Sequence, residues 1–375
     1  MSPALPSQST IAKPDGNAIV WCEGAFNTPN GKTAHGLVRR TARYRVLAVI
    51  DSRHAGKDAG EVLDGRRNGI PVVATLADAL NGAGGRGAAG SSKPTHLVIG
   101  LAPDGGRLPP EGRAAVLDAV RAGLNVDSGL HDFLTEDAEI SALAERQGVL
   151  LRDVRKPPPR KELHFFSGKI DEVGALKVAV LGTDSAVGKR TTAWKIIEAL
   201  EAAGLTAQMV GTGQTAWMQG VRHGIVLDSL INDFVSGEIE HAVWSAWQDG
   251  APDHRPRVIV LEGQGSLMNP AYPGGFELLA AGRPEVVVMQ HAPARREYDG
   301  FPGYPLHPLE QQIAAVQMLS GRKVVAVTVN HEGLKPEEVP AVCAGISRST
   351  GLPCCDVLLQ GAGAVVEAVR PHLSS

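Results

Sequence analysis

The sequence predicts an α/β protein built from two open, mostly parallel sheets, and three features of the 375-residue chain support this fold class. Short apolar runs of strand length alternate with helical patterns throughout both halves. These runs are apolar without interruption, which is typical of strands buried on both faces of a parallel sheet. A proline-rich segment separates the halves, so the sequence favours two domains, each with its own core.

The first half carries six strand-like runs in an order that predicts a Rossmann-like domain over residues 18–154. The runs are "NAIVWCEG", "YRVLAVIDS", "IPVVATL", "THLVIGLA", "LNVDSGL" and "GVLLRDV", with helices such as "EGRAAVLDAVRAG" and "DAEISALAERQG" between several of them. Residues 1–17 precede the first strand, and we interpret them as a mobile tail. The Gly/Ser-rich stretch of residues 81–94 is interpreted as a flexible insertion.

Residues 155–174 are predicted to be a linker, because the three consecutive prolines of "VRKPPP" cannot continue a helix or a central strand. The same alternation of strands and helices resumes after it and predicts a second domain, residues 175–375, with a P-loop NTPase-like sheet. Its strands are expected at "LKVAVL", "LTAQMVGTG", "RVIVLEGQG", "PEVVVMQ", "KVVAVTVN" and "CCDVLL", and its helices at "RTTAWKIIEALEAAG", "LEQQIAAVQMLSG" and "AGAVVEAVRPHL".

Composition points to small-molecule substrates. The formal charge of −3 comes from 37 basic and 40 acidic residues spread along the chain, which gives no electrostatic footprint for nucleic acid or an anionic membrane. No run of eighteen apolar residues occurs, and the N-terminus lacks the basic start and apolar core of a secretory signal, so we expect a cytoplasmic protein. Exposed edges of parallel sheets pair in many proteins, which makes the chain compatible with a homo-oligomer.

The stretch "GTDSAVGKRTT", from Gly182 to Thr192, follows the strand-like run "LKVAVL" and opens a helix. A strand, a glycine-rich turn and a helix in this order make backbone N–H groups converge on an anion, and the lysine adds a positive charge. Two departures from the usual G-x-x-x-x-G-K-[ST] spacing stand out: five residues separate Gly182 from Gly188, and Arg190 replaces the hydroxyl that ordinarily holds Mg²⁺. Thr191 follows one residue late, about 100° round the helix. The loop therefore indicates phosphate binding more strongly than phosphoryl transfer.

Other polar residues fall at strand ends, where ligands of open α/β sheets gather. Glu262 ends one strand and is followed by two glycines, Asn330 ends another and could meet a purine edge, and Gln214 follows a third. In the first domain, charged and histidine side chains follow three strands, and the cationic ones beside glycines suit a small carboxylate. These first-domain residues are Arg53, His54, Lys57, Asp104, Arg107, His131 and Asp132, and His291 and Arg295 follow a strand of the second domain.

The chain as a whole, from about Ala18 to its C-terminus, resembles a family with an N-terminal Rossmann-like domain and a C-terminal P-loop domain that includes the DgcN-type N-acetyltransferases of D-glutamate catabolism. The stretches that carry the resemblance are "VIDSRHAGKDAGEVLDGRRNGIPVV", "GLAPDGGRLPP", "GLNVDSGLHDFL", "VRKPPP", "GTDSAVGKRTTA", "GTGQT", "LEGQGSL" and "GYPLHPL". Separately, "GTDSAVGK", "LEGQG" and Asn330 resemble dethiobiotin synthetase, whose acid at this position binds metal and whose asparagine contacts the base. Arg190 departs from that enzyme, which has threonine there.

The resemblance implies an N-acetyltransferase that uses acetyl-CoA as co-substrate and D-glutamate or a similar acidic amino acid as acceptor. Such a reaction needs a base for the substrate ammonium, for which His131, Asp132, Glu262 and His291 are unranked candidates. The substrate would bind at Arg53, His54, Arg107 and Arg295, and the cofactor at Gly182, Thr183, Asp184, Ser185, Ala186, Val187, Gly188, Lys189, Arg190, Thr191, Gln214 and Asn330, with no metal ligand assigned. The alternatives are an Mg-ATP-dependent ligase or kinase like dethiobiotin synthetase and a non-catalytic nucleotide-binding regulatory protein.

Overall fold

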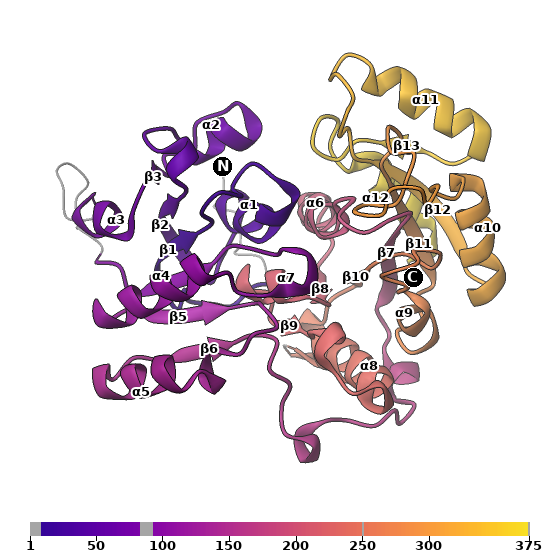
Figure 1. Cartoon of the computed structure of the whole chain (residues 1–375). Coiled ribbons are helices and arrows are strands. Elements are labelled where there is room, and N and C mark those ends of the chain that lie inside the picture. The colour runs from indigo at the N-terminus through magenta and orange to yellow at the C-terminus, as the bar shows by residue number, and fades with distance from the viewer. Residues whose placement is uncertain (1–8, 83–92, 250, 374–375) are drawn as a thin grey trace. The chain divides into compact units, whose positions relative to one another are not determined.

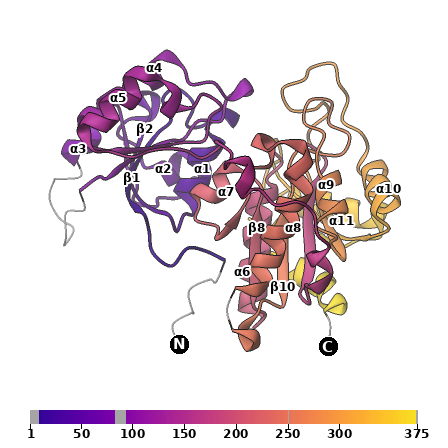
Figure 2. The ribbon, with the colours of Figure 1, turned by 90° about the horizontal axis from the view of Figure 1, so that it is seen from below.

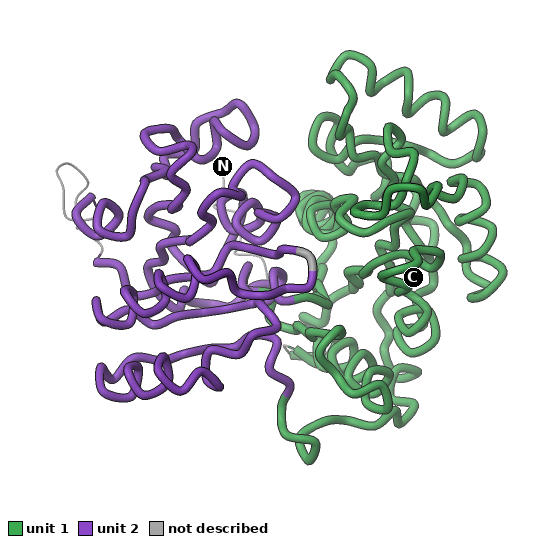
Figure 3. The backbone as a smooth tube through the Cα atoms, viewed as in Figure 1, with its two compact units in different colours: residues 1–9, 158–213, 221–375 green, residues 10–157, 214–220 purple. Residues whose placement is uncertain are grey.

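The computed structural model describes residues 9–82, 93–249 and 251–373, and these fold into two compact units. One unit, here called the Rossmann-like unit, comprises Thr10–Pro157 together with Gln214–Gly220. The other, the P-loop unit, comprises Ser9, Pro158–Gly213 and the described residues from Val221 onward (Figure 3). Most of the Gly/Ser-rich insertion and residues 1–8 of the expected tail lie outside the described residues. Within the described ranges, no helix has both the length and the apolar character needed to cross a bilayer.

The Rossmann-like unit contains a parallel sheet with the strand order β3-β2-β1-β4-β5-β6. The order reverses between β1 and β4, which is the arrangement of a doubly wound sheet. Helices α1 and α2 contact each other, as do α4 and α5, and the two pairs cover opposite faces (Figure 2). The strands are β1 Gly16–Trp21, β2 Tyr44–Ile50, β3 Val72–Val73, β4 His96–Ile99, β5 Asn125–Ser128 and β6 Leu151–Asp153, and the helices are α1 Lys32–Arg39, α2 Ala59–Asp64, α3 Leu76–Gly82, α4 Pro110–Arg121, α5 Ala138–Gln147 and α7 Gln214–Met218.

The P-loop unit contains a second parallel sheet with the order β13-β12-β11-β7-β10-β8-β9. Strand β7 is central and buried along its whole length, which explains its unbroken apolar sequence. Helices α6 and α8 both contact β8 and β10, from opposite sides (Figure 1). The strands are β7 Leu176–Gly182, β8 Ala207–Gly211, β9 His223–Gly224, β10 Val258–Glu262, β11 Val286–His291, β12 Lys323–Val329 and β13 Cys354–Cys355, and the helices are α6 Lys189–Ala202, α8 Asn232–Gln248, α9 Phe276–Ala280, α10 Leu309–Ser320, α11 Val339–Thr350 and α12 Gly363–Val369.

These two sheets confirm the predicted fold class. Residues 158–174 of the expected linker belong to the P-loop unit, with Ile170 and Val173 in its core. A second difference concerns helix α7. Helix α7, which follows a strand of the P-loop sheet in sequence, packs within the Rossmann-like unit. Its Thr215 hydroxyl lies 2.9 Å from the Thr33 hydroxyl, and the guanidinium of Arg43 stacks 3.6 Å from the ring centre of Trp217. The next residue but one, Gln219, donates from Nε2 to the carbonyls of Gly36 and Arg40 at 2.9 and 3.0 Å. These long-range contacts hold the segment in the first sheet's unit.

The described part of the expected tail, from Ser9 to Asp15, is bound rather than loose. Ser9 is fully buried and its hydroxyl donates to the carbonyl of Ala207 at 3.0 Å. Asp15 accepts hydrogen bonds from Arg43 at 2.9 Å and Arg152 at 2.6 Å. The segment therefore pairs with specific partners immediately before β1 begins.

Candidate phosphate site and strand-end clusters

The glycine loop between β7 and α6 has the backbone shape of an anion-binding nest. Ala186 and Gly188 adopt left-handed conformations, with φ of 50° and 100°. The N–H groups of Ala186, Val187 and Gly188 donate to no residue in the part of the chain that the structure describes. The fourteen-residue helix α6 starts at the next position, so its positive end reinforces the same point. A phosphate oxygen is the ligand that these donors suit best.

The side chain of Asp184 holds this loop in place through hydrogen bonds. Its side chain is fully buried, and its two oxygens accept four hydrogen bonds. Oδ1 accepts from the N–H of Ser185 at 2.7 Å and from Asn269 at 2.8 Å, while Oδ2 accepts from the N–H of Asp299 at 2.9 Å and from Arg295 at 3.0 Å. The expected role of Asp184 was contact with the cofactor, but its carboxylate is saturated by the protein, so it acts as the loop's anchor.

Arg295 was expected to bind a substrate carboxylate, and the structure places its guanidinium on the loop instead. Nη1 donates to the carbonyl of Ser185 at 2.9 Å as well as to Asp184, and Nη2 donates to Glu332 at 2.7 Å. Burial disfavours the charge, but the carboxylates of Glu332, Asp299 and Asp184 together outweigh it and raise the pKa of Arg295. The side chain is nearly buried and its donors point at protein acceptors, so it supports the nest.

Asn330 was expected to face a purine base, and its amide is also directed at the loop. Asn330 Nδ2 and Gln290 Nε2 both donate to the carbonyl of Val187 at 3.1 Å, and Asn330 Oδ1 accepts from the N–H of Glu332 at 3.0 Å. Because the Val187 carbonyl points toward these two side-chain amides, the neighbouring backbone N–H groups point the other way, into the nest. Both residues end strands adjacent in the sheet order, β11 and β12.

Lys189 lies across the loop and is buried. Its ammonium donates to the carbonyl of Asp184 at 2.6 Å and to the carbonyl of Gly265 at 2.7 Å. Gly265 has a φ of 50°, and a Cβ there would stand 1.9 Å from the Tyr272 carbonyl, so only glycine fits this point of the turn after β10. The ammonium thus connects the nest to the glycine turn and supplies a positive charge beside it.

Glu262, at the end of β10, is buried next to two cationic side chains. Burial raises the pKa of its carboxyl group, and the charge of Arg190, the N–H of Thr212 and the charge of Lys189 oppose the rise. The Thr212 N–H donates to Glu262 Oε2 at 3.1 Å. Arg190 therefore brings a fixed positive charge close to the carboxylate, at the helix position where P-loop enzymes usually carry the hydroxyl that holds Mg²⁺.

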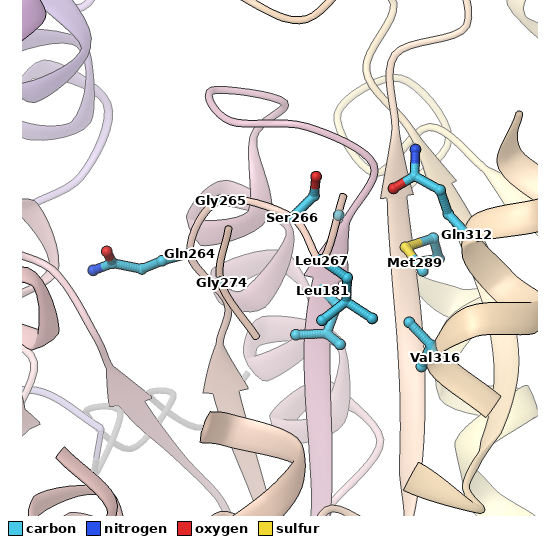
Figure 4. Close-up of a pocket in the computed structure, with 10 residues that line it drawn as sticks. Leu181, Gln264, Gly265, Ser266, Leu267, Gly274, Met289, Gln312 and Val316 are labelled. Atoms are coloured by element: carbon cyan, nitrogen blue, oxygen red, sulfur yellow. The ribbon is translucent and has the colours of Figure 1, made fainter. Parts of the chain in front are cut away.

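A small cavity lies between the end of β7 and the glycine turn after β10 (Figure 4). Its volume is about 10 Å³, which corresponds to roughly one water molecule. Leu181, Met289 and Val316 form its apolar wall, and Ser266 lines it as well. The Ser266 hydroxyl is buried and hydrogen-bonds to no described residue, so a water at this point would satisfy it.

His291 and Thr183 form a buried pair behind the loop. The Thr183 hydroxyl lies 3.0 Å from His291 Nδ1. Burial lowers the pKa of His291 to about 4, with the Glu310 carboxylate opposing the change, so the ring is neutral at neutral pH. Thr183 is fully buried, its N–H donates to the carbonyl of Gln290 at 3.0 Å and its carbonyl accepts from Gln312 Nε2 at 3.1 Å, so the protein occupies the polar groups that were expected to bind a cofactor.

In the Rossmann-like unit, the expected residues gather at the carboxyl edge of the sheet in two clusters. After β4 and β5, Arg107 Nε lies 2.7 Å from Asp132 Oδ1, and the N–H of Leu108 donates to Asp132 Oδ2 at 2.8 Å. Burial opposes ionisation of Asp132, but these two hydrogen bonds outweigh it and lower its pKa. His131 is exposed next to this pair. An ionised, paired Asp132 suits a structural role better than that of a base.

The second cluster follows β2 and contains Asp51, Arg53 and His54. Asp51 is fully buried, its Oδ2 lies 2.7 Å from His54 Nδ1, and Arg53 is half exposed beside it. A cavity of about 470 Å³ begins at Ala55 and extends along β3. Arg53 and His54 were expected from the sequence, whereas Asp51 was not. Asp51 directly follows an apolar strand, and a carboxylate at the end of an apolar strand is the signal that identified Glu262.

Gln214 and Thr191 were also expected to bind the cofactor. Gln214, expected beside the phosphate loop, begins α7 in the Rossmann-like unit and lies against Gly129, where an added Cβ would stand 2.6 Å from Gln214 Cγ. Thr191, in the first turn of α6, is partly exposed. The residues that sequence analysis missed in the P-loop unit, Asn269 and Glu332, act through Asp184 and Arg295, and no motif marks them.

The fold and the loop geometry together define an α/β protein with a P-loop domain and a Rossmann-like domain. Residues 164–366 match the family model described as the DUF1611 C-terminal P-loop domain, and residues 52–157 match the model of its N-terminal Rossmann-like domain, both described as domains of unknown function. The chain belongs to the DUF1611 family.

Two curated relatives and one solved structure agree with this assignment. The chain is 33% identical over 279 residues to a D-glutamate N-acetyltransferase of Tritonibacter scottomollicae, covering 73% of this chain and 80% of that protein. It is 30% identical over 277 residues to a protein of the same name from a Pseudoalteromonas species, covering 72% and 80%. The crystal structure of a DUF1611 family protein from Anabaena variabilis superposes with a TM-score of 0.85 at 28% identity, covering 95% of this chain and 100% of that one.

Proposed function

We propose that this protein is an N-acetyltransferase that moves an acetyl group from acetyl-CoA to the amino group of D-glutamate or a similar acidic amino acid. The observation that carries the proposal is a glycine loop shaped as an anion nest at the start of α6, in which Arg190 and not a hydroxyl residue follows Lys189. The names of the two curated relatives support the reaction class and the acceptor.

Coenzyme A fits the donors of the nest because it carries a pyrophosphate and a 3′-phosphate. The free N–H groups of Ala186, Val187 and Gly188 and the ammonium of Lys189 would bind phosphate oxygens, as they do in other phosphate loops. Acyl transfer leaves those phosphates intact. A fixed arginine charge next to Glu262 therefore suits a loop that binds a carrier and does not activate a phosphate for attack.

The Rossmann-like unit supplies groups for an acidic acceptor. Arg53 and Arg107 are exposed at the carboxyl edge of its sheet, and arginine binds carboxylates in a two-pronged geometry. Arg107 pairs closely with Asp132 at 2.7 Å, whereas Arg53 has only longer contacts, to Asp51 at 3.9 Å and to Asn27 at 3.3 Å, so Arg53 is the stronger candidate of the two. The chemical step requires that the substrate ammonium lose a proton before the amine attacks the thioester carbon.

A direct assay separates this function from the alternatives. The purified protein is incubated with D-glutamate and either acetyl-CoA or Mg·ATP, and free thiol, N-acetylglutamate and ADP are measured, with L-glutamate as the stereochemical control. We expect thiol and N-acetylglutamate in equal amounts with acetyl-CoA. ADP formation without thiol would replace the proposal with an ATP-dependent ligase or kinase, which the buried Glu262 favours. Binding of either nucleotide with no product would indicate a regulatory protein.

A further inference from the structure

The segment after β2 contains a histidine held by a buried carboxylate. Asp51 is fully buried, and its Oδ1 accepts from the N–H of Gly24 at 3.2 Å and of Arg53 at 3.3 Å. Its Oδ2 lies 2.7 Å from Nδ1 of His54, whose side chain is 13% exposed. Strand β2 thus ends in a carboxylate that has one oxygen committed to the backbone and the other to an imidazole.

This arrangement determines which nitrogen of His54 carries the proton. A carboxylate facing Nδ1 favours the tautomer with hydrogen on Nδ1 and stabilises the ring if it becomes an imidazolium. Nε2 then has a free lone pair, and it makes no hydrogen bond to any residue within the described ranges. The charged groups around the pair are Asp51, Arg53 and Glu23, which binds the N–H of Ser52 at 2.9 Å.

The cavity that begins one residue beyond His54 is lined by two cationic and two acidic side chains. Lys57 and Arg67 line it, together with Asp58 and Asp78. Four backbone N–H groups occupy the oxygens of Asp58 and lower its pKa, that of Asn68 most strongly, then those of Gly69, Glu61 and Gly60. Asp78 accepts a hydrogen bond from the Thr75 hydroxyl at 2.7 Å. The Lys57 ammonium has no ion pair or hydrogen bond among the described residues, so its charge is available to an acidic ligand.

We propose that His54, positioned by Asp51, is the proton acceptor for the amino group of the acidic acceptor, and that Lys57 binds a carboxylate of that acceptor. This inference rests on the proposed acetyltransferase function and adds its base. Neither the glycine loop nor the curated relatives' names assign such a role to these residues.

His54 Nε2 takes one proton from the substrate ammonium, and the resulting amine attacks the carbonyl carbon of the acyl thioester, so that a C–N bond forms. When the C–S bond breaks, the departing thiolate takes the second proton of the attacking nitrogen. The imidazolium returns its proton to water, and the products are the amide, the free thiol and one proton.

The competing reading is that Asp51 only caps the short 3-10 turn Ser52–His54. A cap stabilises the turn but transfers no proton, so the two readings differ in how activity responds to an added base. His54→Ala removes the imidazole, and His54→Gln keeps a donor for Asp51 without a basic nitrogen. His254, which is exposed, provides the matched control His254→Gln.

The experiment measures kcat/KM for D-glutamate acetylation in the full chain, with thermal unfolding of every variant. We expect both His54 variants to lose roughly 100-fold or more of kcat/KM, the usual contribution of a general base, while His254→Gln is unchanged. Added imidazoles should restore activity to His54→Ala, with a rate that rises with their basicity. Asp51→Asn should lower kcat, and Lys57→Gln should raise KM for D-glutamate about tenfold with kcat unchanged.

Two results would overturn the inference: His54→Gln with more than a third of wild-type kcat/KM, or imidazole rescue that does not depend on basicity. If His54→Ala fails to fold, the result for His54→Gln decides alone. A wild-type protein that acetylates no acidic amino acid would instead contradict the proposed function, whereas an active wild type with an equally active His54→Gln contradicts only the assignment of the base.

Discussion

The saturated carboxylate of Asp184 gives the sharpest test of how the phosphate nest is built. In Asp184→Asn, the side-chain oxygen can still accept from Ser185 and Asn269, but the new NH₂ group faces two donors, the N–H of Asp299 and the guanidinium of Arg295. A buried donor left without an acceptor costs about 1–3 kcal/mol, and more if it is charged, so the sum is roughly 3–5 kcal/mol.

This loss should be visible in both stability and binding. A change of 1 kcal/mol shifts Tm by about 2–4 °C in a unit of this size, so calorimetry should show a decrease of roughly 6–20 °C. Arg295 also holds the Ser185 carbonyl, so the nest should loosen and titration calorimetry should show at least a tenfold weaker Kd for coenzyme A.

The matched control is Asp171→Asn in the same unit. Asp171 makes an exposed pair with Arg283 at 2.6 Å, and exposed pairs contribute about 0–1 kcal/mol. Asp184→Asn with the Tm and the coenzyme A affinity of Asp171→Asn would refute the view that this carboxylate organises the loop.

Three further changes test neighbouring parts of the site. Lys189→Ala should weaken coenzyme A binding roughly 10- to 100-fold in titration calorimetry, because a charged hydrogen bond contributes about 1.5–3 kcal/mol. The control Lys195→Ala, on the same helix, should leave the affinity unchanged. Equal affinities of the two variants would show that Lys189 does not bind the donor. Gly188 has a φ of 100°, so Gly188→Ala should lower the free energy of unfolding measured in urea by about 1–3 kcal/mol. The control Gly345→Ala, with open space around it and no left-handed φ, should be neutral or stabilising. A Gly188→Ala variant as stable as the wild type would contradict the nest geometry. His291 has a pKa lowered from 6.5 to about 4, so only the unfolded chain takes up its proton between those values, and stability should fall as pH drops through this window by up to about 3 kcal/mol. His291→Gln should flatten the pH dependence of the unfolding free energy there, and an unchanged slope would place the titration elsewhere.

The fold was largely predictable because burial on both faces leaves a direct trace in the sequence. Strand β7 is buried at every residue and reads as an unbroken apolar run, and the glycine loop follows it where the pattern changes to a helix. Helix α7 was not predictable in this way. Its placement depends on Thr215, Trp217 and Gln219 meeting residues of α1 and β2 that are far away in the sequence, and no local pattern encodes such partners.

The same distinction explains the site. The sequence identified Asn330 and Arg295 as polar residues near strand ends, which is where they lie. It could not show that Asn330 would donate to the Val187 carbonyl or that Arg295 would bind Asp184, because these directions depend on side-chain conformations and on the path of the loop. Sequence thus locates candidate residues, and the structure separates those that face the nest from those that support it.

Helix α7 follows a strand of the P-loop sheet in sequence but packs within the Rossmann-like unit, and this affects the order in which the chain can fold. During synthesis, the Rossmann-like unit cannot be completed when its own strands have left the ribosome at Pro157, because Gln214–Gly220 still has to emerge. Until then the carbonyls of Gly36 and Arg40 and the face of Arg43 lack the partners that Gln219 and Trp217 provide. A fragment that stops at the proline-rich linker would therefore lack a segment that the Rossmann-like unit needs, and this unit can be completed only after Gln214–Gly220 has been synthesised.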